Sequence, residues 1–186
     1  MALADVVATS SDPALGAIRL AWWRERLEEL DSGAATAEPR LRAIASQLLT
    51  RGAAGKELSK LEDAWLPLLE PFPWGEGQAE GLRLRGRILF GIGARLLAGD
   101  PRDAEDAGAL WSLADGAHHC SDPQSSEFLL GEARNAGLPA KLPRALRPLT
   151  VLAALAAHDV LRGTSGAGRV SAALAHRIRG TFPRHS

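Results

Sequence analysis

The sequence predicts an all-α protein, and three observations support this fold class. Apolar residues recur at spacings of three and four along most of the chain, which is the period of an amphipathic helix. Alanine and leucine, two strong helix formers, are abundant, and no segment shows the alternating pattern of a β-strand. Because the chain has 186 residues and 46% hydrophobic content, we expect one helical domain over residues 1–186.

Aspartate-proline pairs at residues 12–13, 100–101 and 122–123 mark three helix starts. Each pair puts a carboxylate at the N-cap and proline at the first helical position, where the missing N–H costs nothing. Residues 70–77 and 163–168 are rich in glycine or proline and are expected to form loops. The apolar rows expected to face the core are Leu20, Trp23, Leu27 and Leu30; Leu41, Ile44 and Leu48; Leu58, Leu61 and Trp65; Leu142, Leu146 and Leu149; and Val170, Leu174 and Ile178.

The helix expected over residues 79–99 is unusual because it contains four internal glycines, each of which costs up to ~1 kcal/mol relative to alanine. They favour close approach by another helix, with a ligand as the alternative. Arg83 and Arg87 are four residues apart and share a face, so together they could bind a phosphate. A solvated face on which the arginine stems cover apolar surface is the favoured interpretation.

Composition excludes several classes of protein. The 22 basic and 22 acidic residues balance, so no net charge attracts nucleic acid. Cys120 is the only cysteine, which rules out an intrachain disulfide and a zinc site of several thiolates. No apolar run is long enough for a transmembrane segment. We expect a cytoplasmic protein, with a peripheral position at the inner membrane as a further option. The basic end at residues 177–186 is expected to be solvated, with weak contact to an anionic surface as the alternative.

Trp22 and Trp23 lie side by side in the stretch "GAIRLAWWRERLEELD". On a helix they point about 100° apart. Trp22 extends a row that contains Leu15 and Ile18, whereas Trp23 extends the row of Leu20. Two such rows give a helix that packs against two neighbours, so both tryptophans are expected in the core.

The stretch "DPALGAIRLAWWRERLEEL" resembles a helix of the squalene/phytoene synthase family. The similarity continues through "GLRLRGRILFGIGARLL", "DAGALWSLADGAHHCSD" and "LPRALRPLTVLAALAAHDVLRG". The resemblance implies a helical bundle of the isoprenoid synthase type, here shortened at its N-terminus or with its native start upstream of Met1. Active members join two prenyl diphosphates, with Mg²⁺ held by two aspartate-rich motifs.

Both aspartate-rich motifs are degenerate in this chain. In place of the first, Asp5 stands alone and Thr9 follows one turn later; in place of the second, Asp115 is the only carboxylate within the helix, followed by His118 and His119. Several Mg²⁺ ions need several carboxylates, so two isolated acids do not suffice. The sequence therefore leans against an enzyme, no catalytic residue is assigned, and Mg²⁺ is expected only if the chain is active.

A metal site was also considered at Asp115, His118, His119 and Asp122, which lie along one helical edge. Asp122 is better explained as a helix cap, so we assign no metal and keep Asp5, Asp115, His118 and His119 as weak candidates. Cys120 lacks an orienting acid and is expected to be an incidental thiol rather than a nucleophile.

Three hypotheses for function remain. The first is a catalytically silent relative that binds a protein partner or a prenyl lipid, in the manner of the silent family member that assists assembly of the respiratory complex that oxidises NADH. The second is an active prenyl transferase of isoprenoid biosynthesis with atypical metal ligands. The third is an unrelated helical interaction module. Under the first two, Arg83 and Arg87 are the candidate ligand-binding residues.

Overall fold

The computed structural model describes residues 2–34, 36–137, 141–163 and 166–183. All regular secondary structure in these residues is helical, which confirms the all-α prediction. The chain divides into two compact units, Met1–Pro71 and Phe72–Ser186, so one domain over residues 1–186 stays a prediction. Every helix in the described part of the chain is too short or too polar to cross a membrane.

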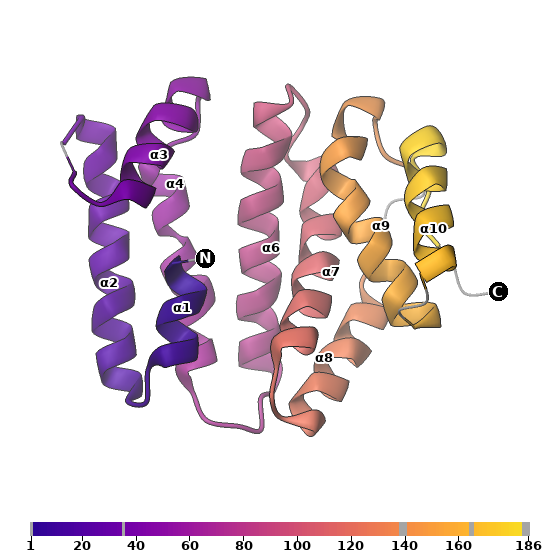
Figure 1. Ribbon diagram of the computed structural model, residues 1–186, viewed down its shortest axis with the longest axis horizontal. Coiled ribbons are helices and arrows are strands. Elements are labelled where there is room, and N and C mark those ends of the chain that lie inside the picture. The colour runs from indigo at the N-terminus through magenta and orange to yellow at the C-terminus, as the bar shows by residue number, and fades with distance from the viewer. Residues whose placement is uncertain (1, 35, 138–140, 164–165, 184–186) are drawn as a thin grey trace. The chain divides into compact units, whose positions relative to one another are not determined.

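The first unit is organised around its longest helix, α2 (Figure 1). Its helices are α1 (Ala2–Thr9), α2 (Pro13–Glu29), α3 (Pro39–Gln47), α4 (Gly55–Ser59) and α5 (Leu61–Trp65), with single 3₁₀ turns at Leu30–Ser32, Leu49–Arg51 and Leu66–Leu69. The side chain of Asp12 accepts a hydrogen bond from the N–H of Ala14 at 2.8 Å, which confirms the predicted cap of α2. Contacts with α1, α4 and α5 cover one side of α2.

A carboxylate that follows α2 ties it to α4. Asp31 accepts hydrogen bonds from the backbone N–H groups of Gly55 (2.6 Å) and Lys56 (2.9 Å), the first two residues of α4. A Cβ atom at Gly55 would lie 2.0 Å from the carbonyl oxygen of Leu27. The two helices therefore approach at a point that only glycine allows, and Asp31 satisfies donors that a helix start leaves unpaired.

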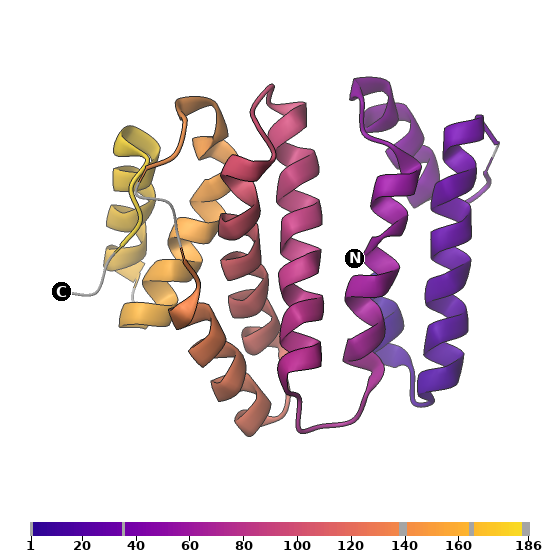
Figure 2. The same cartoon turned by 180° about the vertical axis from the view of Figure 1, so that it is seen from behind.

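The second unit contains five helices, of which α7 is the most buried. Its helix α7 contacts α6, α8 and α9, and α9 lies between α7 and α10 in both views (Figures 1 and 2). The helices are α6 (Glu76–Leu96), α7 (Arg102–His119), α8 (Pro123–Asn135), α9 (Arg147–Arg162) and α10 (Gly166–Arg179), with a 3₁₀ turn at Arg144–Leu146.

Two glycines of α6, Gly86 and Gly93, lie at close approaches between helices, as the sequence predicted. A Cβ atom at Gly86 would lie 2.0 Å from the carbonyl oxygen of Gly108 in α7, and one at Gly108 would lie 2.3 Å from the carbonyl oxygen of Gly86. A Cβ atom at Gly93 would come within 3.0 Å of Leu149 in α9. The α6–α7 crossing thus depends on two glycines that face each other backbone to backbone.

The orientation of α10 differs from the prediction. Val170, Leu174 and Ile178 are 70%, 58% and 64% exposed, so the row expected in the core faces outward. The buried side chain of α10 is His176, whose Nε2 lies 2.8 Å from Oγ1 of Thr150 in α9. The other ring nitrogen, Nδ1, lies 3.1 Å from the carbonyl oxygen of Thr181 and must donate, because a carbonyl only accepts.

Candidate functional site

The outward side of α2 carries an apolar row formed by Leu15, Ile18 and Trp22, which are 59%, 66% and 44% exposed. We call these three residues the α2 row. The prediction that Trp22 lies in the core is therefore wrong, whereas the row of Leu20, Leu27 and Leu30 is buried as expected. One apolar side of α2 packs within the unit, and the other is left to solvent.

The two tryptophans do not share an environment. Trp23 is half-buried, and its ring packs edge to face with that of Trp22, with 5.1 Å between the ring centroids and 85° between the planes. This geometry is favourable for aromatic pairs and fixes the orientation of the exposed indole. Trp22 is thus held in place by its neighbour while its outer surface remains open.

A pocket of about 250 Å³ lies at the C-terminal end of the α2 row. Trp22, Leu30 and Leu41 supply its apolar lining. Two of its charged groups have partners, because Nη2 of Arg26 lies 2.5 Å from Glu29 and the carboxylate of Glu38 accepts a hydrogen bond from the N–H of Leu41 at 2.7 Å. Nε of Arg26 is buried and makes no hydrogen bond within the described residues, so the pocket combines an apolar lining with one donor.

The arginine pair of α6 shares one face, as the sequence indicated, and lines a second pocket of about 220 Å³. Carboxylates surround it: Arg83 binds Glu76 at 2.7 Å and also Glu132, and Glu80 lies 3.3 Å from Arg83 and 3.1 Å from Arg87. Burial by itself lowers the pKa of Arg83, but its bonds to Glu76 and Glu80 and the charge of Glu132 raise it above its ordinary value.

These carboxylates change what the arginine pair offers to a ligand. Asp106 lines the same pocket and adds a further acid. A diphosphate bound by Arg83 and Arg87 would have to displace Glu80 and Glu132 or lie beside them, which is unfavourable between like charges. Diphosphate binding by the pair stays a prediction.

Asp115 is partly exposed and belongs to a polar cluster around the buried Arg85, which the sequence did not predict. Its Oδ2 is 2.6 Å from Nη2 of Arg85, a buried residue of α6. The Nε–H of Arg85 donates to Oγ of Ser112 at 2.7 Å, and its guanidinium lies 5.3 Å from the ring centroid of Trp111. Burial lowers the pKa of Arg85, and the charge of Asp115 opposes that shift. The sequence held one indication of this cluster: Arg85 follows the apolar Leu82 by three residues, so the two side chains share one face of the helix.

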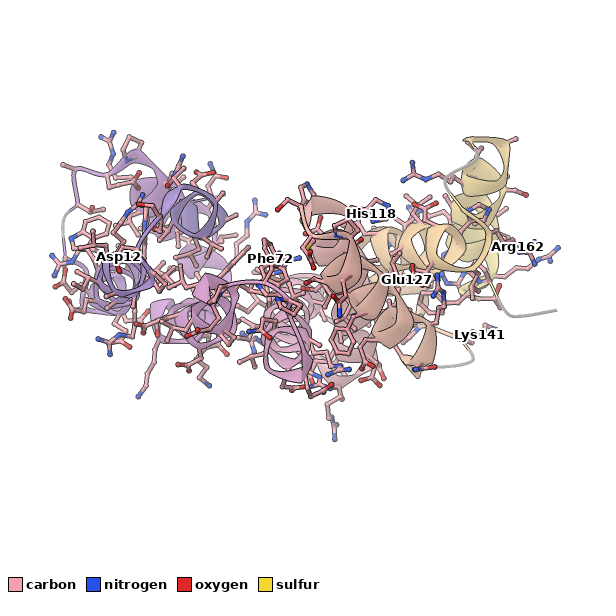
Figure 3. The ribbon with its side chains drawn as sticks, turned by 90° about the horizontal axis from the view of Figure 1, so that it is seen from below. Asp12, Phe72, His118, Glu127, Lys141 and Arg162 are labelled. Atoms are coloured by element: carbon pink, nitrogen blue, oxygen red, sulfur yellow. The ribbon has the colours of Figure 1, made fainter. Side chains whose placement is uncertain are left out.

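The histidines after Asp115 bond to their own helix. Nδ1 of His118 lies 2.7 Å from the carbonyl oxygen of Ala114, and Nδ1 of His119 lies 2.8 Å from that of Asp115. Both side chains are exposed at the end of α7, where Figure 3 labels His118. In the described part of the chain, no three Asp, Glu, His or Cys side chains come together as a metal site would require.

The remaining candidate residues take local roles. Asp122 caps α8 as predicted, since it accepts hydrogen bonds from the N–H (2.8 Å) and the hydroxyl (2.6 Å) of Ser125, which lower the pKa of its carboxyl. In the first unit, Asp5 of α1 lies 3.4 Å from Arg40. Cys120 is a half-buried free thiol at the end of α7.

Comparison with known proteins assigns this chain to no family. Neither the family models, nor the curated proteins, nor the solved structures include a match to this chain. The resemblance to the squalene/phytoene synthase family therefore stays a prediction that depends on the sequence stretches quoted for it.

Proposed function

We propose that the chain is a catalytically silent helical binding protein, derived from the squalene/phytoene synthase family, that holds a partner protein on the α2 row. The observation that carries the proposal is the outward orientation of Leu15, Ile18 and Trp22 beside a pocket with an apolar lining. Tryptophan and arginine are the residues that most often dominate the energy of protein interfaces. The same face would serve an unrelated interaction module equally well.

At these two sites, pocket size favours a protein partner over a prenyl lipid. The pockets at Trp22 and at Arg83 measure about 250 and 220 Å³. Sites for small organic ligands usually measure about 300–1,000 Å³ and bury most of the ligand. A pocket below that range matches one apolar side chain of a partner, which would enter beside Trp22 while the rest of the partner covers Leu15 and Ile18.

The charges around the α2 row indicate the chemistry of that partner. Arg19 and Arg26 alternate with Glu25 and Glu29 along the same side of the helix, so the face has both signs and no net charge. A surface of this kind fits an amphipathic helix with one apolar anchor and mixed charges at its edges. We therefore propose a helix of another protein as the occupant.

The acids that correspond to the metal-binding motifs support a silent protein. Asp115 is engaged by the buried guanidinium of Arg85, and a metal ion there would have to compete with that fixed positive charge. Asp5 is exposed and near Arg40. Mg²⁺ retains its waters unless several hard oxygen ligands are supplied, and an acid paired with arginine is a poor start for such a site.

Site-specific photo-crosslinking in the native host tests the proposal. A photoreactive residue at Ile18 should give a discrete adduct with one protein, whereas the same residue at the exposed position of Arg42 in α3 should not. With the identified partner purified, Trp22→Ala should weaken binding by about 2 kcal/mol, or ~30-fold, as expected for an interface hot spot. Phe72→Ala is the matched control, because Phe72 is also an aromatic side chain with 44% exposure.

Two results would contradict the proposal. One is an Ile18 adduct that is no more abundant than the Arg42 adduct. The other is a purified partner that binds Trp22→Ala as tightly as the parent protein, which would place the contact elsewhere.

A further inference from the structure

Helix α10 has its apolar side turned away from the unit to which it belongs. Val170, Leu174 and Ile178 are four residues apart in succession and form a continuous exposed stripe about 12 Å long. We call these three residues the α10 stripe. The opposite side of α10 is fixed to α9 by buried His176, by its contact with Thr150, and by an ion pair of 3.2 Å between Arg169 and Asp159.

A buried arginine holds the C-terminal end of α10. Nη1 of Arg147 in α9 lies 2.5 Å from the carbonyl oxygen of Ile178 and 3.4 Å from that of Arg177. These are carbonyl groups that the end of a helix leaves without partners, and a guanidinium also suits the negative end of the helix dipole. The outward orientation of the stripe is therefore determined by specific contacts on its other side.

The charge around the α10 stripe is strongly positive. Residues 138–186 hold eight of the 22 basic residues and only one of the 22 acidic residues, Asp159. The carboxylate of Asp159 is 7% exposed and is already paired with Arg169. The chain as a whole is neutral, so this excess is a local property of the C-terminal part and not a property of the composition.

Exposed cations lie near both ends of the stripe. Arg162 ends α9, only a few residues before α10 begins, and Arg177 lies within the last turn of α10, next to Ile178. Lys141 is also near the C-terminal end, because the N–H of its neighbour Leu142 donates to the carbonyl oxygen of Gly180 at 3.0 Å. Figure 3 shows Arg162 beside α10.

We propose that the α10 stripe docks on an anionic lipid surface. A helix with a stripe of aliphatic side chains and arginines beside it can lie in the membrane interface, with the stripe among the acyl chains and the arginines at the phosphates. Each Lys or Arg near an anionic membrane surface adds a similar amount of favourable electrostatic free energy. Residues 138–186 suit such a surface, because their one acidic residue, Asp159, is already paired with Arg169. This inference concerns a different helix and unit from the α2 row and does not depend on it.

An acidic protein is the other occupant that this charge would attract, and the residues of the stripe favour lipid. Valine and leucine are under-represented among the residues that dominate protein interfaces, and the stripe has none of the tryptophan or tyrosine that usually anchors them. The α2 row does contain a tryptophan and is flanked by both signs of charge. The two faces therefore differ in aromatic content and in the sign of the charge around them.

Flotation of the full chain with vesicles tests the proposal. The protein should float with vesicles of phosphatidylcholine and phosphatidylserine and stay behind with vesicles of phosphatidylcholine alone, and binding should weaken as salt is raised. Leu174→Asp should lower the partition coefficient at least tenfold. Leu97→Asp is the control, since it introduces the same charge at an exposed leucine at the end of α6.

A charge variant tests the second half of the inference while leaving the stripe intact. Arg162→Gln with Arg177→Gln should lower the partition coefficient by about fivefold per residue, and circular dichroism should show unchanged helix content. The proposal is overturned if the protein fails to float with anionic vesicles, if it floats equally with neutral ones, or if Leu174→Asp floats like the parent. It is also overturned if Leu174→Asp instead abolishes self-association or binding to an acidic protein while lipid binding persists.

Discussion

Oδ2 of Asp115 in α7 lies 2.6 Å from Nη2 of Arg85 in α6, so the two side chains form an ion pair between these helices. The arginine is buried, its Nε–H donates to Oγ of Ser112, and its guanidinium lies 5.3 Å from the ring centroid of Trp111. The resemblance to the synthase family implies that Asp115 binds a metal ion, but in this structure its carboxylate neutralises the buried guanidinium of Arg85. The pair therefore connects the fold of the second unit to the proposal that the chain does not catalyse.

We predict that Asp115→Asn destabilises the protein by about 2 kcal/mol, because it removes the charge of Asp115 from the buried guanidinium of Arg85. Urea unfolding followed by circular dichroism measures the change. Asp106→Asn, at an exposed acid of the same helix, should change the free energy of unfolding by less than about 0.5 kcal/mol. Equal effects of the two substitutions would show that the pair contributes little.

Gly86→Ala should destabilise the protein by about 3 kcal/mol, since the added methyl group would overlap the carbonyl of Gly108 and force α6 and α7 apart. Gly91→Ala is the matched control in the same helix. Its Cβ would meet its nearest atom, Oε1 of Glu105, at 3.6 Å, so the higher helix propensity of alanine should leave stability unchanged or raise it by up to ~1 kcal/mol. The two melting temperatures should therefore move apart, and a common shift would contradict the tight crossing.

The adjacent tryptophans should respond differently to truncation. Trp22→Ala should cost less than about 1 kcal/mol of stability, because much of the ring is exposed in the parent protein. Trp23→Ala should cost about 2 kcal/mol, somewhat less than the ~3–5 kcal/mol that is usual for a fully buried aromatic residue. Chemical unfolding of both variants provides the comparison, and an equal loss in the two would contradict the exposure of Trp22.

The stability of the α9–α10 contact should depend on pH through His176. Burial lowers the pKa of this histidine below its ordinary value of 6.5; the carbonyl of Thr181 acts against the shift, and the charge of Arg147 adds to it. The unfolded chain therefore binds the proton more readily than the folded one, so stability is complete above pH 6.5 and decreases as the pH falls below it. Titration of the His176 ring by NMR should give a pKa below 6.5, and a value above 6.5 would reverse the predicted direction.

The features that were predicted correctly from sequence are local ones. Asp12 and Asp122 cap their helices because a carboxylate before proline bonds to N–H groups two or three residues away, whatever the rest of the fold does. Gly86 could be assigned to helix packing because glycine within a helix has a cost that close approach explains. The starts of α2 and α8 and the fold class follow from such short-range rules, whereas α7 begins at Arg102 rather than at Pro101, and α10 begins at Gly166, within the expected loop over residues 163–168.

The features that were missed depend on which side of a helix finds a partner. The spacing of Val170, Leu174 and Ile178 predicts an apolar row but not the direction in which it faces, and the contact of His176 with Thr150 turns it outward. In the same way, Asp115 lies along one helical edge with His118 and His119, which suggests a metal site. Its partner in the structure is Arg85, which is 30 residues away in sequence and lies on another helix. Pairings between helices are absent from any pattern within one helix.

Incubation of the purified chain with labelled farnesyl or geranylgeranyl diphosphate and Mg²⁺ tests most directly whether this protein binds rather than catalyses. We expect no hydrocarbon product and no release of pyrophosphate above a heat-denatured control, because Asp115 is paired with Arg85 and Asp5 lies 3.4 Å from Arg40. Product that forms with the parent protein and is lost in Asp5→Asn or Asp115→Asn, with helix content unchanged, would show that the chain is an enzyme and would contradict the account.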